Sequence, residues 1–314
     1  YKQSFALAWF YALGYHLAGL YWISASLFID IARYVWVLPF SLLALPAYLA
    51  LIFAAAACAV HSLRGKPVLH ALALSAALFI NEIIRGSFMG GFPWNLFGYI
   101  WADTLPLIQC VSLFGIHGLT LLTFIACAVF IFLFAPLNKS HIITLACTGI
   151  IFSSLTLWGQ ERLDTTATTY HDNVQLRLVQ PAIEQSERRT VEQRTAALGK
   201  IITMSTKPAE KPITHIIWPE TASPYFLNQQ TEARMALKHI VHKGGAIISD
   251  APSRNMQDGQ RKFYNSLMVM NDQGGIAGRY DKSHLVPFGE FVPFRDILKT
   301  VPVAVDVIGS ADFT

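Results

Sequence analysis

Residues 214–220 read Thr-His-Ile-Ile-Trp-Pro-Glu, a short run of β-branched and aromatic residues that stops at a proline. The run predicts a buried β-strand over residues 214–218, because it contains no charged side chain and proline does not continue a central strand. Glu220 then follows the carboxyl end of that strand. In α/β domains, side chains that bind or react gather at this edge of the sheet. Glu220 is therefore a candidate functional residue.

On both sides of this strand, short β-rich runs alternate with amphipathic segments, which predicts an α/β domain over residues 171–314. Further strands are expected over residues 174–180, 246–249, 263–270 and 275–280, and helices over residues 188–206 and 231–243. Gly244 and Gly245 provide a typical C-terminal signal for the second helix. Asn-Asp-Gln-Gly at residues 271–274 predicts a hairpin turn between the last two strands.

The preceding half of the chain has a different composition. Only nine of residues 1–160 are charged, whereas 35 of the 44 charged residues follow Gln160. A hydrophobic fraction of 53% and a mean hydropathy of +0.41 are high for a water-soluble protein. Residues 1–160 therefore predict a helical membrane domain. Its five apolar runs long enough to cross a bilayer are residues 5–29, 35–60, 68–84, 105–134 and 142–158.

The basic residues of the predicted loops indicate an orientation. Lys2, Arg64, Lys66 and Lys139 fall on alternate connections, and the side of a membrane protein that carries such residues is usually cytoplasmic. After five spans, the α/β domain would lie outside the cytoplasm. That domain has 18 basic and 17 acidic residues after Gln160, so its charge does not favour nucleic acid as a partner. No signal peptide is expected, and the start at Tyr1 indicates a missing N-terminus.

Neither the cysteines nor the histidines of the membrane half predict a metal site or a cofactor. Cys58, Cys110, Cys127 and Cys147 lie in or at the edges of apolar runs, and their spacings fit no metal motif. We interpret them as packing residues. The histidines at positions 16, 61, 70, 117 and 141 have no metal spacing either. The α/β half contains no cysteine.

A second polar motif lies at residues 278–294, which read GRYDKSHLVPFGEFVPF and place Lys282 and Glu290 eight residues apart. Pro287, Gly289 and Pro293 predict a tight backbone there, which is typical of a loop that positions side chains. Together with Glu220, expected in a partly desolvated position, this motif supplies two carboxylates and an ammonium. The alternatives are a solvated or capping Glu220 and a solvated corner at Asp281 and Lys282.

The motifs HIIWPETA (residues 215–222) and GRYDKSHLVPFGEFVPF together resemble the nitrilase superfamily, in particular its apolipoprotein N-acyltransferase branch. In the membrane half, NEIIRG (81–86), GFPWN (91–95) and Gly98-Tyr99 resemble the same family. The resemblance covers essentially the whole chain. It implies a multi-span helical membrane domain joined to an αββα sandwich, here incomplete.

The resemblance implies a Glu-Lys-Cys triad, in which Glu220 is the general base, Lys282 stabilises the oxyanion and Glu290 supports the site. The family's cysteine follows the lysine by more residues than this chain contains after Lys282, so the nucleophile has no match. The expectation is a chain that is truncated at both ends and inactive by itself. In residues 180–190 the chain also lacks the Asn and Trp that many members of the family carry after the first strand.

The implied reaction transfers an acyl group from a phospholipid, through a thioester, to the N-terminal diacylglyceryl-cysteine of an apolipoprotein. A monomer in the bacterial inner membrane, with its α/β domain in the periplasm, is expected. Trp94, Tyr99, Glu82 and Arg85 are candidates for a lipid path. Glu82 and Arg85 could instead be an ion pair that locks helices together. Two alternatives for the whole protein are a catalytically dead binding protein and a membrane-anchored amidase.

Overall fold

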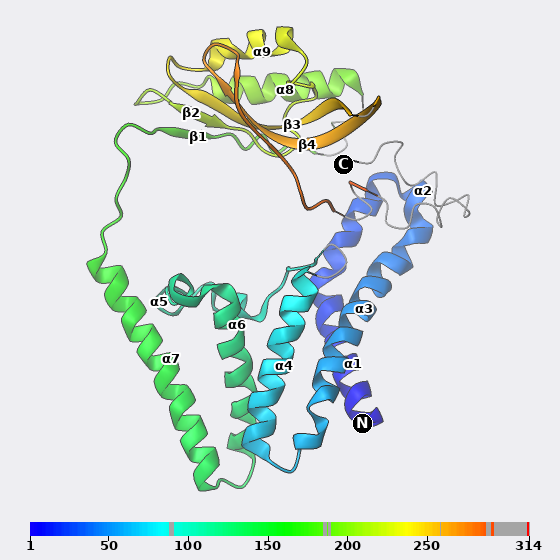
Figure 1. Ribbon diagram of the computed structural model, residues 1–314, viewed down its shortest axis with the longest axis vertical. Helices are drawn as coiled ribbons and strands as arrows, with labels where there is room; N and C mark the ends of the chain where they lie inside the picture. The colour runs from blue at the N-terminus through cyan, green and yellow to red at the C-terminus, as the bar shows by residue number, and fades with distance from the viewer. Residues whose placement is uncertain are drawn as a thin grey trace. The chain divides into compact units, whose positions relative to one another are not determined.

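The computed structural model describes residues 1–87, 91–184, 187, 190–257, 259–286, 290–291 and 313. The chain divides into two compact units, Tyr1–Thr168 and Thr169–Thr314 (Figure 1). The first unit is helical and the second contains a sheet with helices. The helical membrane domain and the mixed α/β domain expected from the sequence are thus both present.

The first unit is built from apolar helices joined by short turns. Its elements are α1 (Lys2–Leu20), η1 (Tyr21–Asp30), α2 (Ile31–Tyr34), η2 (Val35–Val37), α3 (Leu38–Ala59), η3 (His61–Leu63), α4 (Pro67–Ser87), η5 (Phe97–Trp101), α5 (Leu105–Ile108), α6 (Val111–Phe130), η6 (Ile131–Phe134) and α7 (Lys139–Thr165). In the described part of the chain, four helical stretches are long and apolar enough to cross a membrane: Val35–Leu63, Pro67–Ser87, Val111–Phe134 and Lys139–Thr165. They correspond to the last four of the five expected spans.

The expected span over residues 5–29 is divided between two elements, because α1 ends at Leu20 and a 3₁₀-helix follows it. α1 contains polar side chains such as Gln3 and His16, and it is not among the four spanning stretches. It is nevertheless part of the bundle. Ala12 of α1 is buried in one cluster with Phe53 of α3 and Phe124 of α6.

The expected span over residues 105–134 is also interrupted. A short helix, α5, precedes α6, and α6 is kinked where Phe114 and Gly115 leave helical geometry. Gly115 has a φ of +69°, a conformation that glycine adopts without steric cost. α5 packs closely on α7, because a Cβ added to Gly159 would lie only 1.7 Å from the carbonyl oxygen of Pro106. Local hydropathy did not reveal this break.

The second unit contains one five-stranded sheet in the order β1-β2-β3-β4-β5. Its elements are β1 (Leu176–Leu178), α8 (Val191–Ser205), β2 (His215–Ile217), α9 (Thr231–Leu237), η8 (Lys238–Ile240), β3 (Ala246–Gln257), β4 (Gln260–Asn271) and β5 (Ile276–Asp281). β1, β2 and β3 are parallel, whereas β4 pairs antiparallel with both β3 and β5. The two α-helices cover one face of the sheet (Figure 1). Among the described residues this is one sheet of the expected sandwich.

The core of this unit lies between the sheet and its helices. Ile201 of α8, Ile216 of β2, Ile247 of β3 and Met268 of β4 are at most 3% exposed and belong to one cluster. At about 25 cal/mol per Å² of apolar surface, each such side chain stabilises the fold by roughly 1.5–3 kcal/mol. The cluster thus packs α8 against β2, β3 and β4.

The predicted strands are all present, but two of them are longer than expected. β3 continues to Gln257 and β4 begins at Gln260, so they form a long hairpin in which Pro252 pairs with Asn265. The strand predicted from the sequence ends at Ser249, because the polar residues that follow are typical of a loop. The turn at residues 271–274 is confirmed, with Gly274 at a φ of +76°. At the start of α8, Thr190 and Gln193 form a capping box.

Candidate active site

Three polar side chains from separate segments meet at one edge of the sheet. Lys282, the residue after β5, donates from Nζ to Glu290 Oε1 at 2.8 Å. The same Nζ lies 4.0 Å from Glu220 Oε1, three residues beyond the end of β2. All three line a cavity of about 570 Å³, together with Asp250 and Asn265. The structure therefore brings together the three residues that the sequence singled out.

Glu290 is the best-anchored member of this cluster. Its Oε1 also accepts a hydrogen bond from Asn265 Nδ2 at 2.8 Å, and its Oε2 accepts one from the backbone nitrogen of Val286 at 2.8 Å. Its side chain is only 12% exposed. Burial acts to raise the pKa of Glu290, but the donors from Lys282, Val286 and Asn265 outweigh it and hold the pKa below its usual value. The carboxylate thus stays ionised and fixes the Lys282 ammonium.

This lowered pKa predicts a pH-dependent contribution to stability. A carboxylate with a depressed pKa stabilises the fold above its unfolded pKa of about 4.3, and that contribution is lost as the pH falls through the folded pKa. We therefore expect Glu290→Gln to remove part of the acid sensitivity of the intact protein. Thermal unfolding in detergent between neutral pH and the acid limb would measure the difference. Parallel curves for wild type and variant would contradict this expectation.

The structure does not support the solvated corner at Asp281 and Lys282. Asp281 forms an ion pair with Arg279 at 2.7 Å and accepts a hydrogen bond from Ser266 Oγ at 2.6 Å. The backbone nitrogen of Lys282 donates to Asn265 O at 2.8 Å. These contacts anchor the segment to β4. The tight backbone expected at Pro287, Gly289 and Pro293 lies outside the described residues.

We expected Glu220 to be partly desolvated, and this prediction is wrong. Its side chain is 71% exposed among the described residues. Trp218 makes the last bond from β2 to β3, donating from its backbone nitrogen to Ile248 O at 2.9 Å. Pro219 has no N–H to continue the ladder, so the chain leaves the sheet and Glu220 lies at the cavity rim.

Asp250 is a site residue that the sequence analysis missed. It lies on β3, and its Oδ2 accepts a hydrogen bond from the backbone nitrogen of Thr221 at 2.8 Å. Burial raises the pKa of Asp250; the charges of Glu220 and Glu290 raise it further, while the Thr221 bond and Lys282 act in the opposite direction. The available signal was a carboxylate directly after the apolar run AIIS. It was overlooked because the predicted strand ended at Ser249.

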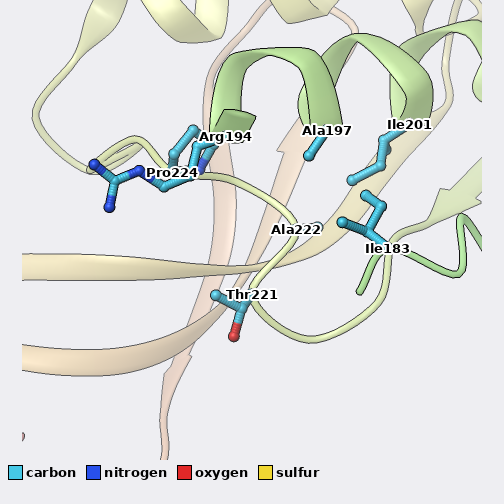
Figure 2. Close-up of a pocket in the computed structure, with 7 residues that line it drawn as sticks. All are labelled: Ile183, Arg194, Ala197, Ile201, Thr221, Ala222 and Pro224. Carbon is cyan, nitrogen blue, oxygen red and sulfur yellow. The ribbon is translucent and has the colours of Figure 1, made fainter. Parts of the chain in front are cut away.

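A second, smaller cavity of about 220 Å³ adjoins the first, and Arg194, Thr221 and Pro224 line both. Figure 2 shows Ile183, Ala197 and Ile201 gathered on one side of this pocket, while the guanidinium of Arg194 extends away from them. The segment after Glu220 thus separates the polar cavity from an apolar one.

The chain's departure from the resembled family after β1 has a conformational counterpart. Ala182 has a φ of +47°. Asn, which many members of the family carry in this turn, tolerates the left-handed region better than alanine. This backbone conformation therefore costs more free energy with alanine at position 182 than it would with asparagine. The neighbouring Ile183 lines the smaller cavity.

In the helical unit, Glu82 and Arg85 form a buried ion pair. Arg85 Nη1 also donates to the carbonyl oxygens of Phe92 at 2.8 Å and Trp94 at 2.6 Å. Asn95 continues this connection to α1, because its Nδ2 donates to Gly19 O at 3.0 Å. These contacts support the interpretation of a pair that locks elements together. A lipid path along Glu82 and Arg85 stays a prediction.

Trp94 and Tyr99, the other two candidates for a lipid path, have accessible side chains. Each is 53% exposed within the helical unit. The ring of Trp94 lies 4.9 Å from that of Trp22, centroid to centroid. Exposed aromatic residues of this kind are typical of the membrane interface. In the described part of the chain no three His, Cys, Asp or Glu side chains converge as metal ligands.

Comparisons with known proteins match both units. Residues 1–129 match the family described as apolipoprotein N-acyltransferase N-terminal domain, and residues 175–312 match the carbon-nitrogen hydrolase family. A protein of Rhodopseudomonas palustris named apolipoprotein N-acyltransferase is 35% identical over 306 residues, covering 93% of this chain and 57% of that protein. One of Agrobacterium fabrum with the same name is 34% identical, covering 94% and 56%. The chain thus spans little more than half the length of these relatives.

Proposed function

Because the chain belongs to the apolipoprotein N-acyltransferase family of the nitrilase superfamily, we propose that the intact protein N-acylates the N-terminal diacylglyceryl-cysteine of apolipoproteins. A phospholipid is the acyl donor in this proposal. The observation that supports it most directly is the meeting of Glu220, Lys282 and Glu290 around one cavity. A carboxylate beside a fixed ammonium suits acyl transfer, which needs a base and a stabiliser of negative charge.

In the first half-reaction, a cysteine thiol attacks the ester carbonyl of the phospholipid while Glu220 takes the thiol proton. The carbonyl oxygen becomes an oxyanion, which the ammonium of Lys282 stabilises. Collapse breaks the ester bond, and Glu220 returns the proton to the leaving alkoxide, so a lysophospholipid and a thioester result. Base assistance matters because a thiol with a pKa of about 8.5 is mostly protonated at neutral pH.

In the second half-reaction, the α-amino group of the acceptor attacks the thioester carbonyl. Glu220 takes a proton from the amine, and Lys282 again stabilises the oxyanion. Breaking the carbon–sulfur bond leaves an amide on the apolipoprotein, and Glu220 returns its proton to the departing sulfur, which restores the thiol. Glu290 does not touch the reacting atoms in this scheme. It holds the ammonium of Lys282 in place.

In this proposal, none of the four cysteines of residues 1–314 supplies the thiol. Cys58, Cys110, Cys127 and Cys147 all belong to the first unit and to the expected spans or their edges. We propose that the nucleophile belongs to sequence that follows Thr314, and that residues 1–314 alone form no acyl-enzyme. This assignment fits the 57% share of the Rhodopseudomonas palustris relative that the chain spans.

A membrane location supports a lipid donor. The four spanning stretches and the exposed aromatic residues Trp94 and Tyr99 are typical of a multi-pass membrane protein. In our proposal this membrane is the bacterial inner membrane. In our proposal the protein acts as a monomer with its α/β unit on the periplasmic side. That orientation follows from the basic loops and counts α1 among the membrane helices.

The test uses the intact protein in liposomes whose phospholipid carries an alkyne-tagged acyl chain. We expect a label on the protein that hydroxylamine removes, as a thioester requires, and transfer of the tag to a diacylglyceryl-cysteine peptide. The matched control is Glu220→Gln, which keeps the size of the side chain but cannot accept the proton. A folded wild type that binds the peptide without forming the thioester would contradict the proposal and favour a binding protein. Ammonia released from a soluble amide would favour an amidase.

A further inference from the structure

Thr221, the residue after the proposed base, has an unusual backbone conformation. Its φ is +55°, in the left-handed region that β-branched residues rarely adopt. A conformation of this kind costs of the order of 1–3 kcal/mol and persists only where surrounding contacts enforce it. Such strain clusters at functional sites. A contact must therefore hold the peptide between Glu220 and Thr221 in this conformation.

The contact comes from β3. At the end of β2 the ladder stops with Trp218, and Pro219 has no N–H to donate. The next N–H groups are those of Glu220 and Thr221, and Asp250 Oδ2 accepts from the Thr221 nitrogen at 2.8 Å. Asp250 is two residues beyond Ile248, the acceptor of the last ladder bond. The carboxylate of Asp250 therefore binds the segment that follows β2, after that segment has left the sheet.

From this geometry we infer that Asp250 is a positioning residue, whose carboxylate holds the strained peptide at Thr221 and so sets where the Glu220 carboxylate lies. The inference rests on the proposed function of Glu220 as the base. Asp250 is itself fixed, because β3 pairs with β2 on one side and β4 on the other. Without the bond, Thr221 would relax to a negative φ. Glu220, already 71% exposed, would then leave the neighbourhood of Lys282.

Three variants of the intact protein separate this role from a general effect on folding. Asp250→Ala removes the acceptor, and we expect acyl-enzyme formation to slow by about 10–100-fold, as a misplacement of about 1 Å can cause. Asp250→Asn keeps an acceptor oxygen and should retain most of the rate. Adding Thr221→Gly to Asp250→Ala should recover much of the loss, because glycine adopts a positive φ without steric cost. The Thr221→Gly single variant is the reference for the pair.

A second readout needs no activity. Amide hydrogen exchange of the peptide that covers residues 219–224 should quicken at Thr221 in Asp250→Ala and stay slow in Asp250→Asn. Unchanged exchange in Asp250→Ala, or a rate of acylation within threefold of wild type, would overturn the inference. Asp250→Asn as slow as Asp250→Ala would also overturn it, since the charge and not the hydrogen bond would then matter. A wild type that forms no acyl-enzyme would instead refute the proposed function.

Discussion

Lys282→Met in the intact protein is expected to slow acyl-enzyme formation by about 10²–10³-fold, the usual effect of removing one donor to an oxyanion. The loss should be in the rate of the chemical step, since the ammonium acts on charge that develops in the transition state. The substitution also leaves Glu220, Asp250 and Glu290 around one cavity without the ammonium between them. Single-turnover acylation from a labelled phospholipid measures the effect.

Two further variants make this result interpretable. Lys243→Met removes an exposed lysine outside the cavity and should acylate at the wild-type rate. Combining Glu290→Gln with Lys282→Met also removes the carboxylate that Lys282→Met alone leaves without its cation. We expect the double variant to fold as well as wild type and still acylate slowly. Recovery of the rate in the double variant would mean that Lys282 serves only to neutralise Glu290.

Arg85→Met is expected to destabilise the protein by about 3–5 kcal/mol, the usual cost of breaking a buried ion pair from one side. The side chains of both Arg85 and Glu82 are at most 2% exposed, so the substitution would leave a buried carboxylate without its cation. It would also remove the donor to the carbonyl oxygens of Phe92 and Trp94. Thermal unfolding in detergent, followed by tryptophan fluorescence, measures the loss.

A double variant tests the reason for this loss. Glu82→Gln with Arg85→Met replaces the charge on both sides, so we expect it to be more stable than Arg85→Met alone. Arg64→Met, at an exposed arginine beside η3, is the control for removing a positive charge from the helical unit. A double variant no more stable than Arg85→Met would assign the cost to the lost carbonyl contacts of residues 92–94. Wild-type stability of Arg85→Met would contradict the role of the pair altogether.

The sequence by itself determined the two-unit organisation, the positions of the strands and three members of the candidate site. Glu220, Lys282 and Glu290 could be predicted because each lies in a short motif whose apolar neighbours mark a strand end or a constrained turn. The last four apolar runs predicted the spanning stretches for a similar reason, since length and hydropathy are properties of a local segment.

Only the tertiary structure decided which side chains hold those residues in place. The bond from Thr221 to Asp250 joins residues 29 positions apart, and the pocket position of Asp250 follows from the pairing of β3 with β4. The contact between Asn95 and Gly19 likewise joins a loop to α1 across 76 positions of the sequence. A local sequence pattern predicts which face of a segment is buried. The partner of a hydrogen bond depends instead on how the fold brings distant segments together.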